Sequence, residues 1–224
     1  MVLVFDLDDT LYNELAYVGS GFNAVSAYLS SRFKLNKDIV RKRMICLLME
    51  QGRGKVFNSV LKEYNIFSEK EVSNCISVYR SHKPEIKLYP DAYSFIKKKQ
   101  NLPIYIVTDG NKIVQRKKIE ALGLLSIIKK AIPTRNYGIK YEKPSPYVFQ
   151  KICEFEKCDS KKVIYFGDNP LKDFVGIKPL GFKSIRLLRG QFQNVSVKST
   201  HAAHLNIPDF KSLTDSILYS LTKS

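Results

Sequence analysis

Short apolar runs recur along the chain with the pattern of buried parallel strands. Each run is rich in Val, Ile, Tyr and Phe, which is typical of strands that are covered on both faces of a sheet. The runs are Val2–Phe5, Pro103–Val107, Val163–Phe166 and Ser184–Leu187. They predict four strands of a parallel sheet.

Amphipathic helical patterns lie between the later runs. One pattern leads to the stop signal Gly123, a second begins at Ser145, and a third closes the chain from 213 to 221. Their inward-facing residues are Val114, Ile119 and Leu122; Val148, Phe149 and Ile152; and Leu213, Ile217, Leu218 and Leu221. Because strands alternate with helices, the predicted fold class is α/β, with a Rossmann-like, doubly wound parallel sheet.

The segment from 13 to 88 has a different pattern. It contains no convincing strand, but apolar residues repeat at helical spacing in several stripes. These are Val18, Phe22, Val25 and Leu29; the cluster from Met44 to Met49; Phe57, Val60, Leu61 and Tyr64; and Val72, Cys75, Ile76 and Tyr79. We therefore predict an α/β core domain of residues 1–12 and 89–224, with a helical bundle of residues 13–88 inserted after the first strand.

Composition excludes several broad classes of protein. Of 224 residues, 44% are hydrophobic and 26% are charged, so the chain is not disordered as a whole and can bury a core without disulfides or a structural metal. No segment is long enough to cross a bilayer, and the apolar run before Asp6 is too short for a signal peptide. We expect a soluble, cytoplasmic monomer or weak homodimer without a membrane partner.

The net charge of +16, from 37 Lys and Arg against 21 Asp and Glu, is unusual. It favours anionic partners such as phosphorylated metabolites, nucleic acids or acidic lipids. The basic clusters are short, and most lie in helical patterns where charges usually face solvent: Arg41-Lys42-Arg43, Lys97-Lys98-Lys99, Arg116-Lys117-Lys118 and Lys161-Lys162. Since no nucleic-acid-binding motif accompanies them, we interpret them as surface residues and do not expect nucleic acid as the partner.

Acidic and polar residues follow three of the predicted strands at their carboxyl ends. The clusters are Asp6-Leu7-Asp8-Asp9-Thr10, Thr108-Asp109-Gly110-Asn111 and Gly167-Asp168-Asn169-Pro170, with Asp173 shortly after. Because Asp favours junctions between strands and loops, the first cluster alone could be a loop start. Ligands of open α/β sheets bind beyond the carboxyl ends of the strands, so three clusters there indicate a single binding site.

The residue types in these clusters suit a metal ion and a phosphoryl group. A buried carboxylate is unfavourable unless it is paired or bound to a cation. Asp6, Asp8 and Asp168 can converge from two strands, and an oxygen-only set of this kind suits Mg²⁺. The start of the following helix is a natural anion site. The candidate substrate-binding groups there are Thr108 and the turn formed by Asp109, Gly110 and Asn111.

Lys143-Pro144, which precedes a predicted helix, completes a set of four ordered motifs. In chain order the motifs are Asp6-Leu7-Asp8-Asp9-Thr10, Thr108, Lys143-Pro144 and Gly167-Asp168-Asn169-Pro170-Leu171-Lys172-Asp173. Together they resemble the motifs of the haloacid dehalogenase-like (HAD) hydrolase superfamily, and the resemblance spans nearly the whole chain. A helical insert between the first and second motifs resembles the helical cap of the C1 class of these phosphatases.

The resemblance implies a phosphatase that works through an aspartyl-phosphate. Asp6 would be the nucleophile, and Asp8 would protonate the leaving oxygen and then activate water. The dehalogenases of the superfamily lack an acid at the second position, because a leaving halide needs no proton. The presence of Asp8 therefore favours phosphoester chemistry. The candidate catalytic residues are Asp6, Asp8, Thr108 and Lys143.

The resemblance also implies Mg²⁺ as the cofactor. The carboxylates of Asp6 and Asp168 and the backbone carbonyl of Asp8 would hold the ion. Asp173 would either orient Lys143 or bind the metal through water. Lys143, with the threonine of the second motif, would bind the phosphoryl oxygens and offset the charge of the transition state.

In relatives of this kind the cap closes over the site and selects the substrate. Within the insert, Arg53 and Lys55 belong to a Gly-flanked basic turn, Gln51–Lys55. The turn is either an ordinary connection between helices with solvated side chains or a contact with a distal, anionic part of the substrate. We predict that the substrate is a small phosphomonoester, either a phosphosugar or a nucleoside monophosphate.

Two other functions stay open at this point. A phosphomutase would use the same nucleophile and release little phosphate. A basic nucleic-acid-binding protein would bind with a steep dependence on salt and would not need Asp6.

Overall fold

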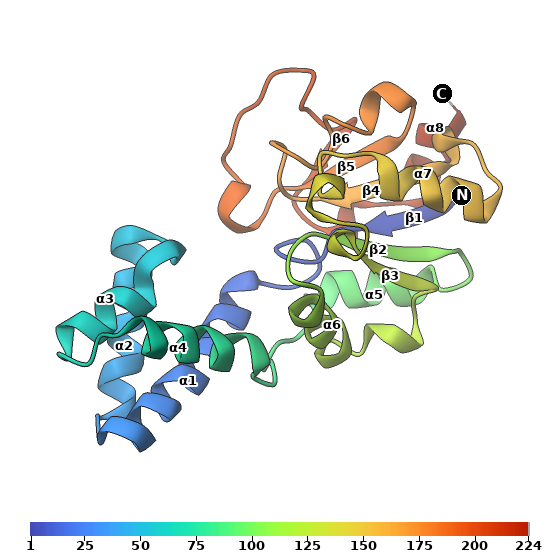
Figure 1. Ribbon diagram of the computed structural model, residues 1–224. Helices are drawn as coiled ribbons and strands as arrows, with labels where there is room; N and C mark the ends of the chain where they lie inside the picture. Colours follow the sequence, from blue (N-terminus) through green and yellow to red (C-terminus); the bar gives the residue numbers. More distant parts are fainter. Residues whose placement is uncertain (224) are drawn as a thin grey trace. The chain divides into compact units, whose positions relative to one another are not determined.

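The computed structural model describes residues 1–223 and contains one sheet of six parallel strands, in the order β3-β2-β1-β4-β5-β6 (Figure 1). The strands are β1 (Val2–Phe5), β2 (Ile104–Thr108), β3 (Lys130–Pro133), β4 (Val163–Gly167), β5 (Lys183–Leu187) and β6 (Leu205–Ile207). The order reverses between β1 and β4, as in doubly wound sheets that bind ligands at such a point.

Contacts within the chain divide it into two compact units, a core unit of Met1–Glu14 and Lys87–Ser224 and a helical unit of Leu15–Ile86. The longer helices of the core unit are α5 (Pro90–Lys98), α6 (Lys112–Ala121), α7 (Tyr147–Glu156) and α8 (Asp215–Lys223). Short 3₁₀ turns connect several of them: η2 (Leu124–Ser126), η3 (Thr134–Asn136), η4 (Ile139–Tyr141), η5 (Ser160–Lys162), η6 (Lys178–Leu180), η7 (Gly190–Phe192) and η8 (Phe210–Ser212).

The central strands are apolar throughout because both faces of the sheet are covered. Alternate residues of β1 point to opposite faces. Val2 and Val4 belong to a buried cluster with Val148 and Phe149 of α7. Phe5 instead belongs to an aromatic cluster that includes α5 and η8 residues, with Phe5, Phe95, Phe166 and Phe210 in mutual ring contact. The sheet is thus covered on both faces.

The helical unit consists of α1 (Glu14–Phe33, whose first residue is counted with the core unit), α2 (Lys37–Gln51), the 3₁₀ turn η1 (Arg53–Lys55), α3 (Val56–Glu63) and α4 (Glu69–Ser81). The stripes Val18/Phe22/Val25/Leu29, Val60/Leu61 and Val72/Cys75 form its buried core. Asn36 and Ser68 cap α2 and α4 by accepting hydrogen bonds from backbone amides of the first turns. Gly21 lets Tyr79 approach α1, because an added Cβ would lie 2.3 Å from the tyrosine ring.

The structure confirms the predicted α/β fold class and all four strand runs, whose ends shift by one residue at most. It also adds the two edge strands, β3 and β6, which the apolar pattern does not predict. Both are short and partly exposed, so they lack the continuous apolar run of a strand that is buried on both faces. No helix within residues 1–223 combines the length and apolar character required to span a membrane.

One interpretation of the basic clusters is wrong. Lys99 and Lys118 were assigned to solvated faces, but their residues are only 8% and 3% exposed. Lys99 pairs with Asp215 of α8, and Lys118 pairs with Asp8. Each buried ammonium therefore has a carboxylate partner, as burial of a charge requires.

The aromatic cluster on the sheet yields a test of the core. Phe166 stacks on Phe5 with ring centroids 4.6 Å apart and is fully buried. We expect Phe166→Ala to lower the free energy of unfolding by about 3–5 kcal/mol. The substitution removes the transfer free energy of the buried ring and leaves a cavity where the ring contacts were. Urea unfolding followed by circular dichroism measures the change. Phe155→Ala, at a 63% exposed phenylalanine, is the matched control and should change it by less than about 0.5 kcal/mol.

Candidate active site

Two of the predicted acidic residues extend from neighbouring strands at the point where the strand order reverses. Phe5 of β1 pairs with Phe166 of β4, and the amide of Asp6 donates a hydrogen bond of 2.8 Å to the Phe166 carbonyl. Asp6 thus follows β1 directly, beside the end of β4 that leads into Asp168. Both aspartates are buried. The parallel register therefore brings two carboxylates from distant parts of the sequence to one edge of the sheet.

Lys143 is the central cation of this site. Its Nζ lies 2.5 Å from Asp6 Oδ1 and 2.8 Å from Asp173 Oδ1, and it donates a hydrogen bond of 2.9 Å to the Tyr165 hydroxyl. The lysine side chain is 1% exposed. Burial alone would lower the pKa of Lys143, but Asp173 and Asp6 raise it well above its ordinary value. Lys143 is therefore a buried, permanently charged ammonium.

Asp173 is held on both of its carboxylate oxygens. Oδ1 accepts from Lys143 and, at 3.2 Å, from the Tyr165 hydroxyl. Oδ2 accepts from the amide of Asn169 at 2.9 Å. Gly167 makes room for this arrangement, because an added Cβ would lie 2.4 Å from Asp173 Oδ2. Asp173 was expected either to orient Lys143 or to bind the metal through water. Its contact with Lys143 favours the first role.

The loop after β1 is tightly folded around Asp9. This residue has a φ of 53°, in the left-handed region, where aspartate is better tolerated than most residues. Its Oδ1 accepts from the amide of Glu14 at 2.9 Å, and its Oδ2 accepts from the amide of Gln191 at 3.4 Å. Gly190 lies directly against it, because an added Cβ would be 2.3 Å from Asp9 Cγ. The loop is thereby joined to a segment far along the sequence.

Thr10 and Arg189 fix the other side of the same loop. The Thr10 hydroxyl donates to Asp168 Oδ1 at 3.2 Å, and the Arg189 guanidinium donates to the Thr10 carbonyl. Arg189 also binds both oxygens of Asp91 at 3.0 and 3.2 Å and lies 4.2 Å from the Tyr89 ring centroid. These contacts fix the position of Asp168 relative to the loop.

The Asp8 carboxylate lies in a polar pocket formed by α6 and the loop itself. Lys118 Nζ donates to Asp8 Oδ1 at 2.6 Å, Gln115 Nε2 donates to Oδ2 at 3.3 Å, and the Tyr12 hydroxyl also donates to Oδ1. The Asp8 side chain is 22% exposed, whereas that of Lys118 is 3% exposed. Burial alone would raise the pKa of Asp8, but the Lys118 ammonium and the three hydrogen bonds lower it. These donors therefore favour the carboxylate form of Asp8.

The side chains after β2 serve mainly to build the loops. Asp109 accepts from the Lys143 amide at 3.1 Å, from the Thr134 hydroxyl at 2.8 Å and from Lys172 Nζ at 3.0 Å. Burial would raise the pKa of Asp109, but Lys143 and Lys172 lower it. The Asp109 carboxylate is therefore anchored by one ammonium, one hydroxyl and the backbone amide of Lys143.

The other residues predicted to bind the substrate lie in both units of the chain. Thr108 ends β2 and is buried. Asn111 caps α6, with its side chain accepting from the amides of the first turn, and the Gly110 amide donates to Glu142 Oε1 at 3.1 Å. Arg53 and Lys55 belong to the helical unit, where η1 is exposed. Asp109 and Gly110 are thus bonded to residues 143 and 142, whereas Arg53 and Lys55 lie in the other unit.

Lys143 compensates the buried carboxylates of Asp6 and Asp168 only in part. Burial, reinforced by Asp6 and Asp173, raises the pKa of Asp168 to about 9. Burial also raises the pKa of Asp6 to about 7, although the Lys143 ammonium acts in the opposite direction. Both rises have the cause expected for adjacent carboxylates in a poorly solvated site. A divalent cation at this place would favour the ionised forms.

The donor set fits Mg²⁺ rather than a metal that requires an all-protein cage. Within residues 1–223, no three His, Cys, Asp or Glu side chains are arranged to hold a metal ion. Mg²⁺ does not need such a group, since it commonly takes one or two carboxylates and keeps water or phosphate oxygens as its other ligands. Asp6 and Asp168, with the Asp8 carbonyl, form a set of that size. The carboxylates of Asp8 and Asp173 are instead bound to lysines.

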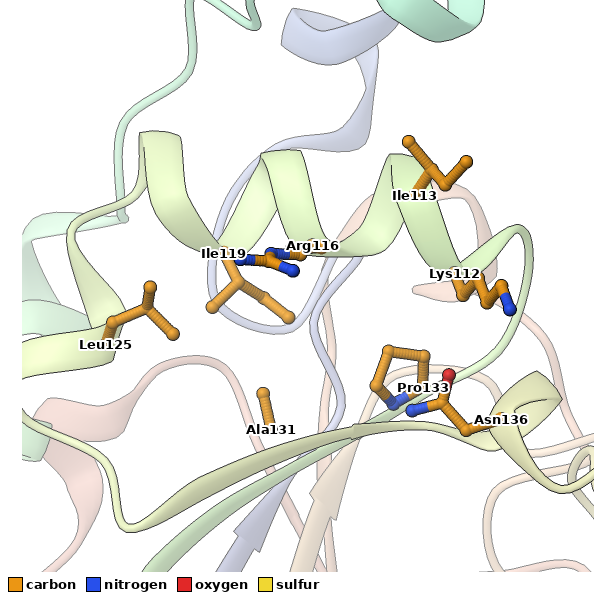
Figure 2. A pocket seen from close by; sticks show the side chains of 8 residues that line it. All are labelled: Lys112, Ile113, Arg116, Ile119, Leu125, Ala131, Pro133 and Asn136. Atoms are coloured by element: carbon orange, nitrogen blue, oxygen red, sulfur yellow. The ribbon is translucent and has the colours of Figure 1, made fainter.

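A separate cavity of about 540 Å³ lies between α6 and the edge strand β3 (Figure 2). Its lining consists of Lys112, Ile113, Arg116, Ile119, Leu125, Ala131, Pro133 and Asn136. None of these residues belongs to the motifs at the carboxyl ends of β1 and β4. Arg116 is paired with Glu120 on the same helix. The candidate active site is therefore assigned from the carboxylates and Lys143, and not from this cavity.

Sequence reasoning missed Lys118, Gln115, Tyr165 and Lys172 as parts of the site. A signal for the first two was present. Lys118 follows Val114 by four residues and Gln115 by three, so all three lie on one helical face. The apolar member of that face indicates that Lys118 points inward. Lys172 lies within the fourth motif, but the motif alone assigns it no contact with Asp109. Tyr165 has no comparable signal, because its role depends on a contact with Lys143 that only the folded chain shows.

Comparison with known proteins agrees with this fold. Residues 3–187 match the family model described as haloacid dehalogenase-like hydrolase. The chain therefore belongs to the haloacid dehalogenase-like hydrolases, a family of enzymes.

Similar proteins of known name include two archaeal phosphatases. The glyceraldehyde 3-phosphate phosphatase of Methanocaldococcus jannaschii is 24% identical over 200 residues, which cover 86% of this chain and 87% of the relative. The protein of the same name from Pyrococcus furiosus is 26% identical over 222 residues, which cover 96% and 91%.

Solved structures show the same fold. The 2-haloacid dehalogenase from Pseudomonas syringae aligns with a TM-score of 0.66 at 18% identity, covering 98% of this chain and 99% of the other. The HAD hydrolase YfnB from Bacillus subtilis, described as bound to magnesium, aligns with a TM-score of 0.66 at 17% identity, covering 98% and 97%.

The contact between Gly190 and Asp9 can be tested by comparing two glycines. Gly190 and Gly123 have similar positive φ values of 70° and 66°, but an added Cβ meets Asp9 at Gly190 and nothing within 4 Å at Gly123. We expect Gly123→Ala to lower the free energy of unfolding by about 1 kcal/mol through backbone strain. Gly190→Ala should lower it by a further 1–3 kcal/mol or so. Denaturant unfolding measures both, and equal losses would contradict the close contact.

Proposed function

We propose that the chain is a Mg²⁺-dependent phosphatase that hydrolyses a small phosphorylated metabolite through an aspartyl-phosphate on Asp6. Membership of the hydrolase family and the phosphatase names of its relatives make it a phosphoric monoester hydrolase. One observation carries the mechanism: Asp6, at the end of a central strand, contacts a buried lysine that Asp173 holds from the other side. This arrangement supplies a fixed carboxylate beside a fixed positive charge.

Asp6 is the nucleophile in this proposal. One carboxylate oxygen of Asp6 attacks phosphorus, and a bond forms between them while the bond from phosphorus to the ester oxygen breaks. Asp8 enters this step as the protonated acid and gives its proton to the departing oxygen, so that an alcohol leaves and Asp8 becomes the carboxylate that Lys118 and its other donors stabilise. A water molecule then attacks phosphorus, Asp8 takes the proton of that water, and the bond to Asp6 breaks. Inorganic phosphate is released and both carboxyl groups return to their starting states.

Lys143 and Thr108 bind the phosphoryl oxygens in this proposal. The Lys143 ammonium is buried and held in place by Asp6, Asp173 and Tyr165, so it is already oriented before the substrate arrives. Positive charge that is fixed in advance stabilises the negative charge of the transition state without reorganisation. The Asp109 carboxylate, which accepts from the Lys143 backbone amide, fixes the start of the same loop.

Mg²⁺ is the proposed cofactor, held by Asp6, Asp168 and the Asp8 carbonyl. When bound, it supplies positive charge beside the carboxylates and the phosphoryl group. The raised pKa values of Asp6 and Asp168 support this proposal, because they mark the place where such charge is lacking. The magnesium in the related Bacillus subtilis hydrolase is consistent with it.

The proposed substrate is a small sugar phosphate, with a nucleoside monophosphate as the second class. Relatives that match over most of their length are named for a three-carbon sugar phosphate, which favours the first class. We propose that residues 13–88 act as the cap that selects it, with Arg53 and Lys55 as candidate contacts to its distal part. A location in the cytoplasm and a monomer or weak homodimer are further parts of this proposal.

Phosphate release from a substrate panel tests the function. The panel contains glyceraldehyde 3-phosphate, other sugar phosphates and nucleoside monophosphates, each with Mg²⁺ and with a chelator. We expect release to require Mg²⁺ and to fall by about 10³-fold or more in Asp6→Asn, because the amide cannot act as the nucleophile. Asp159→Asn, which changes an exposed aspartate, is the matched control and should retain full activity.

Two results would contradict the proposal. Equal release with and without Mg²⁺ would remove the metal from the mechanism, and full activity of Asp6→Asn would remove the nucleophile. If instead the phosphoryl group moves to another position of the sugar and little free phosphate appears, the chain is a phosphomutase.

A further inference from the structure

The Asp8 carboxylate is held from three directions by residues that the four motifs do not include. Oδ1 accepts from Lys118 Nζ at 2.6 Å and from the Tyr12 hydroxyl. Oδ2 accepts the longer hydrogen bond, 3.3 Å, from Gln115 Nε2. A carboxylate bound on both oxygens has a fixed rotamer, so its direction is determined before any substrate arrives.

Lys118 is buried, although a lysine on a surface helix normally extends into solvent. Its side chain is 3% exposed, whereas Arg116, two residues earlier, has a side chain that is 79% exposed. A buried ammonium is unfavourable unless it is paired and hydrogen-bonded. The Asp8 carboxylate provides that pairing, and Lys118 also lies 5.9 Å from the Tyr12 ring centroid. The position of Lys118 is therefore tied to Asp8.

Gln115 gives a second, independent indication. It is 5% exposed, and within residues 1–223 its Oε1 is buried without a hydrogen-bond partner. An unsatisfied buried acceptor is destabilising. A leucine of similar size would avoid this disadvantage, so the amide is not explained by stability. Its hydrogen bond to Asp8 is the contact that explains it.

We infer that Lys118 and Gln115 are positioning residues that direct the Asp8 carboxyl group toward the leaving oxygen. The inference rests on the proposed function, in which Asp8 exchanges a proton with that oxygen. Proton transfer of this kind depends on placement within hydrogen-bond reach. Small displacements of an aligned group have large effects on the rate. Lys118 and Gln115 act through Asp8 and do not touch the reacting atoms.

Two other roles for Lys118 have different consequences. If the ion pair only stabilises the fold, its loss lowers stability and reduces the rate for every substrate by the same factor. If Lys118 binds substrate directly, its loss raises KM and leaves kcat nearly unchanged. A positioning role instead reduces kcat most for substrates whose leaving oxygen is strongly basic, because those substrates need the proton. An aryl phosphate, whose leaving oxygen is a weak base, needs it much less.

The experiment compares an alkyl phosphate with an aryl phosphate in the full-length protein with Mg²⁺. The alkyl phosphate is the sugar phosphate that the wild type hydrolyses fastest, and the aryl phosphate is p-nitrophenyl phosphate. We expect Lys118→Met to reduce kcat for the alkyl phosphate by about 10²-fold, the lower range for general acid catalysis. The loss for the aryl phosphate should be less than about 10-fold, with both KM values changing little.

Two further variants, Gln115→Leu and Lys118→Arg, distinguish a loss of positioning from a loss of folding. Gln115→Leu removes the bond to Asp8 together with the unsatisfied acceptor, so it should fold at least as stably as the wild type and still show the selective loss. Lys118→Arg retains the charge and should recover part of kcat for the alkyl phosphate. Lys99→Met is the matched control, because Lys99 is also buried and paired, with Asp215. It should show no difference between the two substrates.

The outcomes separate the inference from the function on which it rests. Equal losses for both substrates in Lys118→Met and Gln115→Leu would overturn the positioning role while leaving the phosphatase intact. A raised KM with unchanged kcat would overturn it in favour of substrate binding. If the folded wild type releases phosphate from neither substrate, the proposed function fails and the inference fails with it.

Discussion

The active site depends on one buried cation, the ammonium of Lys143. Parallel pairing of β1 and β4 brings Asp6 and Asp168 together, and Asp173 contacts the same lysine as Asp6. Such a group of carboxylates cannot be buried without positive charge. Lys143 supplies part of that charge from a loop that belongs to neither strand. The glycine at the end of β4, the Tyr165 hydroxyl and the anchored Asp109 all serve to keep this lysine and its partners in place.

The two acidic residues of the first motif have different electrostatic surroundings although they are only two positions apart. Asp6 contacts a lysine that is shared with another carboxylate, and burial still raises its pKa. Asp8 contacts Lys118 together with two neutral donors, and its pKa is lowered. The two shifts differ in direction because burial dominates at Asp6, whereas the Lys118 ammonium and the hydrogen bonds together outweigh burial at Asp8. The loop after β1 makes this separation possible, because it brings Asp6 to Lys143 and Asp8 to Lys118 of α6.

Much of the fold could be predicted from sequence because the central strands are apolar throughout. The edge strands β3 and β6 could not, since partial exposure removes that pattern. The motif residues were predictable from their order along the chain. The partners of those residues were not: Lys118 carries the charge of a surface residue, and only its contact with Asp8 explains its burial. The role of the Asn111 backbone at the substrate stays a prediction, and the Asn111 side chain caps α6.

The position of β1 in the middle of the sheet has a consequence for synthesis of the chain. Residues 2–5 leave the ribosome well before their neighbours β2 and β4, which begin at Ile104 and Val163. The helical unit, Leu15–Ile86, is contiguous in sequence, and local contacts of that kind form quickly. Strand β1 therefore stays without its partners β2 and β4 while the whole helical unit is synthesised. During that interval this strand is the segment most in need of protection from aggregation.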